Sequence, residues 1–338
     1  MAKGWIFKAR PTGMPDSSTA SLEELPHRDL GENEIRVANH WLSVDPYMRG
    51  RMNDQKSYVA GFQLGEPIGG GAVGAVIESR NPGFSVGDKV LHMAGWRDEA
   101  VVTPMEMPTK LPQQLLDAGV PEQAFLSSLG LTGGTAWVGL LKVAEAKEGE
   151  VVFVSAAAGA VGSAVTQLAK AKGMRVIGSA GGAAKVERVL GMGADAAIDY
   201  KAGPVLPQLS KALQAMGAGG VDVYFDNVGG AHLDAAFAVA SDFARFAICG
   251  MIDSYNDGKP QEMKYIIRTI PARVRMQGFI YTDHFFKHMA EFYDDMGGLV
   301  IAGKVMTEET VRDGVESTFD AFLGLFRGEN FGKMLVRV

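Results

Sequence analysis

The spacing of apolar residues along the chain changes near residue 125. Up to that point, short alternating runs are separated by turn residues such as Asn81-Pro82-Gly83, a pattern typical of a mostly β, barrel-like domain. The strands expected there are 34–39, 69–78 and 89–93. The first predicted domain therefore covers residues 1–125.

Beyond residue 125, apolar runs of strand length alternate with helical stretches. This alternation predicts an α/β domain with a doubly wound parallel sheet over residues 126–298. The final residues, 299–338, predict a helix and a strand-like run that returns to the first domain. The strands expected in the sheet are 151–154, 174–178, 195–199, 221–225, 243–248 and 274–281. A small-residue turn at 132–135 is expected to lead into a helix, and further helices are expected up to about 172, at 204–216 and at 231–239.

A glycine-rich turn joins the strand 151–154 to the helix that follows it. The turn reads Ala157-Ala158-Gly159-Ala160-Val161-Gly162, the dinucleotide fingerprint G-x-G-x-x-G with alanine in the first glycine place. Such a turn offers free N–H groups and the positive end of the helix dipole to a pyrophosphate. Gly159 allows close approach to the phosphates, and Gly162 allows the helix to pack on the strand. The alternative is a tight turn without a ligand, and the complete β-α-β context favours the nucleotide site.

The residues after this turn indicate which nucleotide binds. An NAD site places Asp or Glu about 20 residues beyond the glycines, on the ribose 2′-hydroxyl. That position is Ser179 here, and no acid occurs between Ser155 and Lys185. Lys185 supplies a positive charge that attracts a 2′-phosphate, although a solvated helix lysine is the alternative for this residue taken alone. The sequence therefore predicts NADP(H).

Several further residues follow the expected strands directly. In open parallel sheets, ligands bind at the carboxyl ends of the strands. Any one of these residues could simply end its strand, but five at one edge favour a shared binding site. They are Tyr200, Asn227, Cys249, Gly250 and Phe279.

Composition sets limits on the remaining classes of function. The chain has 338 residues, 47% of them hydrophobic and 21% charged, which is ordinary for a soluble protein of two domains. A net charge of −6 argues against a broad nucleic-acid-binding face. The single cysteine, Cys249, forms no internal disulfide, and the N-terminus has no apolar segment typical of a signal peptide. We expect a cytoplasmic protein with no membrane span.

The sequence resembles the zinc-independent medium-chain dehydrogenase/reductases. Within them it is most similar to the group of leukotriene B4 dehydrogenase/prostaglandin reductase, plant double-bond reductases and bacterial curcumin reductases. The resemblance covers nearly the whole chain and implies a GroES-like β-barrel followed by a Rossmann domain, with the cofactor between them. The runs that carry it are SVDPYMRGRM, VSAAAGAVGS, FDNVGG, CGMIDSYN, QGFIYTDH and GENFGKM.

The resemblance also implies roles for particular residues. It places the 2′-phosphate on Lys185 and Tyr200, and the substrate carbonyl beside Tyr255. Tyr47 and Tyr58 match tyrosines of the substrate pocket, although the residues alone favour partly buried tyrosines that are anchored by their hydroxyls. The phosphate turn corresponds to Ala158, Gly159, Ala160, Val161 and Gly162, and the other expected NADP(H) contacts are Ser179, Asn227, Cys249, Gly250, Ile252, Tyr255, Phe279, Ile280, Tyr281 and Asn330.

Two departures from the group affect the expected pocket. The run Leu131-Thr132-Gly133-Gly134-Thr135-Ala136-Trp137 replaces the usual Met-Pro-Gly-(Leu/Phe)-Thr-Ala-Tyr at the nicotinamide wall. Asp253-Ser254 before Tyr255 adds an acid near the pocket. Zinc-dependent relatives need a lobe of four cysteines, which one cysteine cannot build, and His40, His92 and His284 lack ligand spacing, so no metal is expected.

The expected activity is NADPH-dependent reduction of the C=C bond of α,β-unsaturated ketones or aldehydes. Hydride adds to the β-carbon, and the Tyr255 hydroxyl or the nicotinamide ribose 2′-hydroxyl stabilises the enolate oxygen. The α-carbon takes its proton from solvent or a relay. Alternatives are a quinone reductase or an alcohol dehydrogenase on the same scaffold, or an NADPH-binding protein without turnover. The resemblance further implies a homodimer formed through the sheet edge at 274–281.

Overall fold

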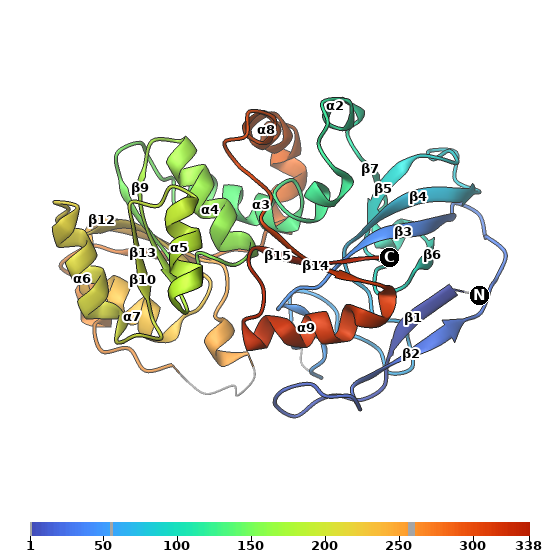
Figure 1. The fold of residues 1–338 in the computed structure, drawn as a ribbon, viewed down its shortest axis with the longest axis horizontal. Coiled ribbons are helices and arrows are strands. Elements are labelled where there is room, and N and C mark those ends of the chain that lie inside the picture. The colour runs from blue at the N-terminus through green and yellow to red at the C-terminus, as the bar shows by residue number, and fades with distance from the viewer. Residues whose placement is uncertain (1, 55–56, 256–260) are drawn as a thin grey trace. The chain divides into compact units, whose positions relative to one another are not determined.

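The computed structural model describes residues 2–54, 57–255 and 261–338. Asn256, the last residue of the quoted run CGMIDSYN, lies outside them. The chain forms two compact units, drawn in Figure 1. The first unit contains Met1–Leu126, Glu309–Asn330 and Met334–Val338, and the second contains Ser127–Glu308 and Phe331–Lys333.

The first unit is built on antiparallel strands, as the short alternating runs predict. Strands β1 and β2 form a two-stranded sheet, and a larger sheet has the order β14-β15-β3-β4-β5-β7, with β6 also paired to β3. The C-terminal strand β15 pairs with β3 in the register Leu335↔Ser43, so the chain end completes the sheet that its beginning starts (Figure 1). The strands are β1 (Ala2–Phe7), β2 (Ala20–Leu25), β3 (Ile35–Ser43), β4 (Ala72–Ser79), β5 (Lys89–His92), β6 (Glu99–Val102), β7 (Thr109–Lys110), β14 (Glu309–Asp313) and β15 (Lys333–Arg337).

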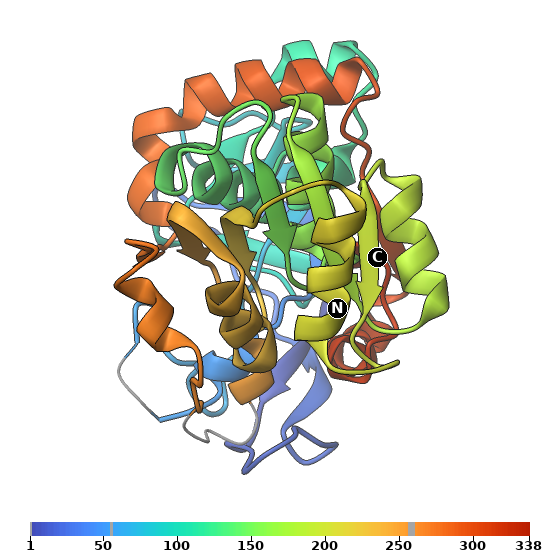
Figure 2. The ribbon, with the colours of Figure 1, turned by 90° about the vertical axis from the view of Figure 1, so that its left-hand side faces the viewer.

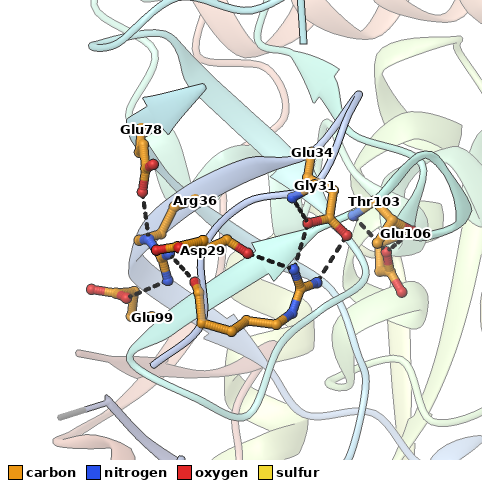
Figure 3. A network of polar contacts seen from close by, with 9 residues as sticks. Asp29, Gly31, Glu34, Arg36, Glu78, Glu99, Thr103 and Glu106 are labelled. Carbon is orange, nitrogen blue, oxygen red and sulfur yellow. Dashed lines mark hydrogen bonds and ion pairs between the residues drawn. The ribbon is translucent and has the colours of Figure 1, made fainter. Parts of the chain in front are cut away.

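Aromatic packing and a buried arginine hold this unit together. Trp96 is fully buried with its ring edge-to-face with those of Phe319 and Phe322, on helix α9 (Thr318–Arg327). Arg36 lies beneath the sheet surface and binds Glu78 at 3.0 Å and Glu99 at 3.3 Å, which ties β3 to β4 and β6 (Figure 3). Because a buried guanidinium needs such partners, this network is structural. The other helices of the unit are α1 (Met48–Arg51) and α2 (Gln113–Asp117).

The second unit contains the predicted parallel sheet. Its strand order is β10-β9-β8-β11-β12-β13, with each neighbouring pair parallel. The direction in which the chain winds reverses between β8 and β11, and ligands of such sheets bind at this reversal point. The strands are β8 (Val151–Val154), β9 (Arg175–Ala180), β10 (Ala196–Asp199), β11 (Val221–Asp226), β12 (Ala240–Ile248) and β13 (Arg275–Gly278).

Helices cover both faces of this sheet, which confirms the doubly wound class (Figure 2). Helices α6 and α7 bury Leu209 and Leu233 in one core with Phe153 of β8 and Ile177 of β9. Alternate strand residues such as Val152 are equally buried and face the other way. The helices of the unit are α3 (Leu131–Trp137), α4 (Ala160–Ala171), α5 (Ala183–Gly191), α6 (Val205–Ala215), α7 (Gly230–Ala238) and α8 (Thr282–Ile301).

The structure corrects three sequence-based expectations. Residues 132–135 lie inside α3, and Val138–Val143 continue it as a π-helix, because the glycines there serve close packing instead of a turn. Helix α8 was not predicted. The stretch from 299 is not one helix before the last strand: α8 ends at Ile301, and β14 intervenes between Gly303 and Gly314, which both have positive φ.

Candidate functional site: a dinucleotide-binding sheet edge

The phosphate turn has the geometry that its glycines predict. Strand β8 ends at Val154 and α4 begins at Ala160, with Gly159 in extended conformation at its N-cap. No side chain caps this helix, and its first turn contains no acid, so its N–H groups are available to an anion. A Cβ on Gly162 would collide with the carbonyl oxygen of Ala156, which explains why this place requires glycine.

A segment from the end of the chain lies on the same turn. The backbone N–H of Gly332 donates to the carbonyl of Ala158 at 2.8 Å, and Gly332 forms an isolated parallel bridge with Gly159. Gly332 has φ +60, and a Cβ there would collide with the carbonyl of Glu308. The resemblance pointed to Asn330, which belongs to the first unit, but gave no role to Gly332. Its glycine type is a signal of a tight turn, yet nothing in the sequence indicates its partner.

Basic side chains gather where β9 and β10 end. Lys185 lies on α5, and Tyr200 directly follows β10 with its hydroxyl against Gly181, where a Cβ would stand 2.6 Å from that oxygen. Lys201 comes beside them, with its Cε 3.0 Å from the same Cβ position. In the part of the chain that the structure describes, neither Lys185 nor Lys201 forms an ion pair with a carboxylate. Lys201 is not among the residues that the sequence predicts for this site, although a lysine next to a tyrosine at a strand end is a signal of anion binding.

The electrostatics of this cluster favour an anion. Burial, and then the charge of Lys201, lower the pKa of Lys185. Partial burial, and then the charge of Asp199, raise the pKa of Tyr200, so its hydroxyl keeps its proton. Asp199 is occupied by the backbone, since it accepts from Gly182 at 2.8 Å and from Lys201 at 2.9 Å. A phosphate group here would relieve the repulsion between two ammonium groups.

Ser179 lies at the end of β9, but its side chain points inward. It is fully buried, and its Oγ lies 2.8 Å from Nε2 of His232 on α7. Its carbonyl accepts from the N–H of Ala157 at 2.8 Å, so its backbone supports the phosphate turn. Burial lowers the pKa of His232 to about 4, which keeps the imidazole neutral at physiological pH. No sequence pattern indicates the role of His232, because its contact with Ser179 joins segments far apart in the chain.

Asn227 is held in place by Ser155, the residue that directly follows β8. Its backbone N–H donates to Oγ of Ser155, and its side-chain amide donates to the carbonyl of Ser155, both at 2.8 Å. Asp226 is fully buried beside it, where Oδ1 accepts from the Tyr224 hydroxyl at 2.6 Å and from the N–H of Gly229 at 2.8 Å. Burial raises the pKa of Asp226. These bonds hold the turn that carries Asn227 at the sheet edge.

The run after β12 continues the same edge. The N–H groups of Cys249 and Gly250 donate to the carbonyl of Asp226 at 2.9 and 3.0 Å. Burial, and then the charge of Asp226, raise the pKa of the Cys249 thiol to about 12, so the thiol keeps its proton near neutral pH. Ile252 begins a short 3-10 helix, and Tyr255 follows it with its hydroxyl near Gly250, where a Cβ would stand 2.8 Å from that oxygen.

The residues after β13 pack on the segment 131–137, whose sequence differs from that of the related group. Phe279 packs edge-to-face on Phe225, Ile280 is half-buried beside it, and the ring of Tyr281 lies against Gly134. Trp137 is buried, and its indole N–H donates to the carboxylate of Asp295 on α8 at 2.9 Å. The departure from the group's usual sequence therefore has a local packing role in this unit.

Two predicted pocket tyrosines belong to the first unit. The Tyr47 hydroxyl hydrogen-bonds the side chain of Arg51, whose Nε donates to the carbonyl of Ala60 at 2.9 Å. Burial, and then the charge of Asp45, raise the pKa of Tyr47, so it stays a protonated donor. Tyr58 has 64% of its surface exposed. Tyr47 is thus anchored by Arg51, and Tyr58 is the more exposed of the two tyrosines.

Side chains that could bind a metal are scattered in the part of the chain that the structure describes. No cluster of three or more His, Cys, Asp or Glu side chains able to hold a metal ion occurs among residues 2–54, 57–255 and 261–338. His92 is buried, with Nδ1 accepting from Ala94 and Nε2 bonded to Asn39 at 2.9 Å, and burial lowers its pKa to about 3. The described donor set does not fit a zinc site. Within the same ranges, no helix is long and apolar enough to cross a membrane.

A parallel sheet of this order, with a glycine turn at its reversal point and two lysines where β9 and β10 end, is typical of a dinucleotide-binding domain. Residues 3–110 match the family model described as the N-terminal domain of oxidoreductase, and residues 160–295 match the model described as zinc-binding dehydrogenase. The chain belongs to the medium-chain dehydrogenase/reductase family, as its sequence resemblance predicts.

Individual relatives extend over nearly the full length. The chain is 40% identical to the NADP(+)-dependent 2-alkenal reductase of Nicotiana tabacum, covering 98% of this chain and 96% of that protein. It is 36% identical to the NADPH-dependent curcumin reductase of Escherichia coli, with 99% and 96% covered. The crystal structure of CurA from Vibrio vulnificus in complex with NADPH superposes with a TM-score of 0.91 at 36% identity, covering 99% of each chain.

Proposed function

We propose that this protein is an NADPH-dependent reductase of the C=C bond in α,β-unsaturated ketones and aldehydes. The observation that carries the proposal is the full-length similarity to a 2-alkenal reductase and a curcumin reductase, both named as NADP-dependent. The phosphate turn and the two lysines near Tyr200 are consistent with the same cofactor. The prediction from sequence and this proposal therefore agree.

The chain's own residues divide the work of binding NADP(H). The N–H groups at the start of α4 receive the pyrophosphate, and Lys185, Tyr200 and Lys201 surround the 2′-phosphate. Asn227 and the segments 249–252 and 279–281 line the nicotinamide end, as their places at the strand ends suggest. Bound NADPH supplies the hydride that adds to the β-carbon of the substrate, and the α-carbon takes its proton from solvent or a relay.

Stabilisation of the substrate oxygen is the second task. Negative charge develops on the carbonyl oxygen as the β-carbon is reduced, and a hydroxyl aimed at that oxygen lowers the barrier by about 3 kcal/mol. Tyr255 is the donor that we assign to this task, with Tyr58 and Tyr47 as further substrate contacts. The protein otherwise contributes placement, with reacting atoms about 3–3.5 Å apart.

Product identity tests the proposal. Purified protein is incubated with NADPH and a 2-alkenal, and the products are identified by gas chromatography. We expect the saturated aldehyde. An allylic alcohol would show carbonyl reduction instead, turnover only with quinones would show a quinone reductase, and tight NADPH binding without turnover on enones, quinones or aldehydes would show a non-catalytic binding protein. Each of these three results would overturn the proposal.

We also propose a homodimer that forms through the edge strand β13. The four residues of β13 are all exposed, and Met276 keeps 50% of its surface accessible. Ile267 and Ile270 on the preceding segment are 67% and 73% exposed, so the apolar surface extends beyond the strand. β13 ends the strand order of its sheet, and an edge strand with exposed apolar side chains on and near it favours pairing with a second copy. Sedimentation velocity at micromolar concentration should give a dimer, and Met276→Lys should give a monomer; a monomeric parent protein would refute this.

The proposed location is the cytoplasm. The single cysteine can form no disulfide within the chain, which suits a reducing compartment. Fractionation of cells that express the protein from its own gene should recover it with cytoplasmic markers, and recovery in an exported fraction would contradict the proposal.

A further inference from the structure

Ser179 on β9 and His232 on α7 form a buried hydrogen-bonded pair near the expected 2′-phosphate site. Ser179 stands where an NAD site has an acid for the ribose 2′-hydroxyl. Its side chain points into the protein, and its hydroxyl oxygen lies 2.8 Å from Nε2 of His232. Ser179 and His232 are 0% and 5% exposed. The ribose hydroxyl of NADH therefore finds no acceptor on this side chain.

His232 also contacts the tyrosine of the basic cluster. Its ring lies edge-to-face with that of Tyr200, with centroids 5.4 Å apart and an interplanar angle of 76°. On its other side it stacks on Phe153 of β8, at 6.4 Å and 18°. With neighbours on these sides and one bond to Ser179, the imidazole has a fixed orientation. Tyr200 in turn lies against Gly181, beside Lys201.

We propose that His232 is a positioning residue for cofactor selection: its bond to Ser179 and its contact with Tyr200 hold the ends of β9 and β10 in the arrangement that receives a 2′-phosphate. The inference rests on the proposed 2′-phosphate site at Lys185 and Tyr200. His232 itself does not touch the cofactor. It acts on two residues in contact with it, Ser179 on β9 and Tyr200 directly after β10.

The mechanism of selection has two parts. The bond directs the Ser179 hydroxyl inward, so the ribose of NADH gains no hydrogen bond there. The ring contact keeps the Tyr200 hydroxyl beside Lys201, where it can donate to a phosphate oxygen of NADPH. Loss of the bond therefore weakens ligands with a 2′-phosphate and does not weaken ligands without one.

The test uses the full-length protein and two small probes, 2′,5′-ADP and 5′-AMP, measured by isothermal titration calorimetry. His232→Phe keeps a ring between Phe153 and Tyr200 but removes Nε2, and Ser179→Ala removes the partner hydroxyl. Each variant should raise the Kd of 2′,5′-ADP roughly three- to tenfold, as expected for the loss of one hydrogen bond, and that of 5′-AMP by less than about twofold. The ratio of KM for NADPH to KM for NADH should rise in parallel.

The double variant separates positioning from packing. A buried hydroxyl left without its partner costs stability, whereas removal of both partners is nearly neutral. The double variant should therefore regain the thermal stability lost by either single variant, while its selectivity for 2′,5′-ADP stays low. Recovery of selectivity together with stability would overturn the inference. Thr318→Val, which removes a buried hydroxyl bonded to Val315 in the first unit, is the control, and it should lower stability without changing the ratio of the two probes.

Lys185→Ala distinguishes failure of this inference from failure of the site. If Lys185→Ala weakens 2′,5′-ADP selectively but His232→Phe does not, the inference is wrong and the site stands. If Lys185→Ala weakens both probes equally, the proposed 2′-phosphate site is wrong and the inference falls with it.

Discussion

The phenol ring of Tyr281 packs directly on Gly134. A Cβ placed on Gly134 would stand 2.6 Å from Cζ of that ring and 2.8 Å from its hydroxyl oxygen. Gly134→Ala must therefore displace Tyr281, and overpacking of this kind costs about 1–3 kcal/mol of unfolding free energy. Because Tyr281 is one of the predicted cofactor contacts, the Kd for NADPH should rise as well. Urea denaturation and fluorescence titration measure the two effects.

Gly191→Ala is the matched control for that variant. Gly191 is the last residue of α5, its φ is not positive, and a Cβ there meets no atom within 4 Å. The substitution should be neutral or should stabilise the protein by about 0.5–1 kcal/mol, because alanine loses less backbone entropy in a helix. Equal destabilisation by the two alanines would show that the Tyr281 contact is not the cause.

Cofactor preference should depend on the charge at Lys185. Lys185→Ala should raise KM for NADPH at least about tenfold and change KM for NADH little, because only NADPH carries the 2′-phosphate. Lys201→Ala should act in the same direction with a smaller effect, since Lys201 is the more exposed of the two. Lys211→Ala, on the exposed side of α6, serves as the control. Equal losses with both cofactors would remove Lys185 from the 2′-phosphate site.

Activity should not depend on a metal. The only cysteine has a pKa raised to about 12, and no cluster of three or more ligating side chains occurs among the residues that the structure describes. Prolonged dialysis against EDTA and 1,10-phenanthroline should leave kcat unchanged, and elemental analysis should find no stoichiometric zinc. One zinc per chain, with activity lost on its removal, would contradict this expectation.

The sequence predicts the parallel sheet well because its strands are short apolar runs bounded by glycine or by helical stretches. Helix α8 escapes prediction because only Phe292, Met296 and Gly297 are buried among its 20 residues, which leaves a weak apolar stripe. Residues 132–135 look like a turn because their small size suits one. Their actual role, close approach to Tyr281 and to the backbone of Ser128, depends on tertiary packing.

Some residues of the candidate site can be predicted from the sequence and others cannot. Residues at strand ends, such as Tyr200 and Asn227, follow from the topology alone. His232 and Gly332 do not, because each acts through a contact with a segment distant in the sequence. The inward orientation of the Ser179 side chain also cannot be predicted from the sequence. The spacing of about 20 residues from Gly159 identifies the position but not the direction of the side chain.

Tyr255 carries the proposed polarisation of the substrate carbonyl. Tyr255→Phe should lower kcat/KM for a simple enone by roughly ten- to a thousandfold, the range for loss of one oxyanion donor, and should leave NADPH affinity nearly unchanged. Tyr58→Phe is compared in parallel. Near-normal rates for Tyr255→Phe together with slow rates for Tyr255→Ala would show that the ring only packs and that the ribose hydroxyl polarises the carbonyl.

The position of the transferred hydride tests the central claim most directly. The protein is supplied with NADPH that carries deuterium at the transferred C4 position and with an enone, and the product is analysed by NMR. The account predicts the saturated ketone with one deuterium on its β-carbon and none on the carbonyl carbon. Deuterium on the carbonyl carbon of an allylic alcohol would contradict it.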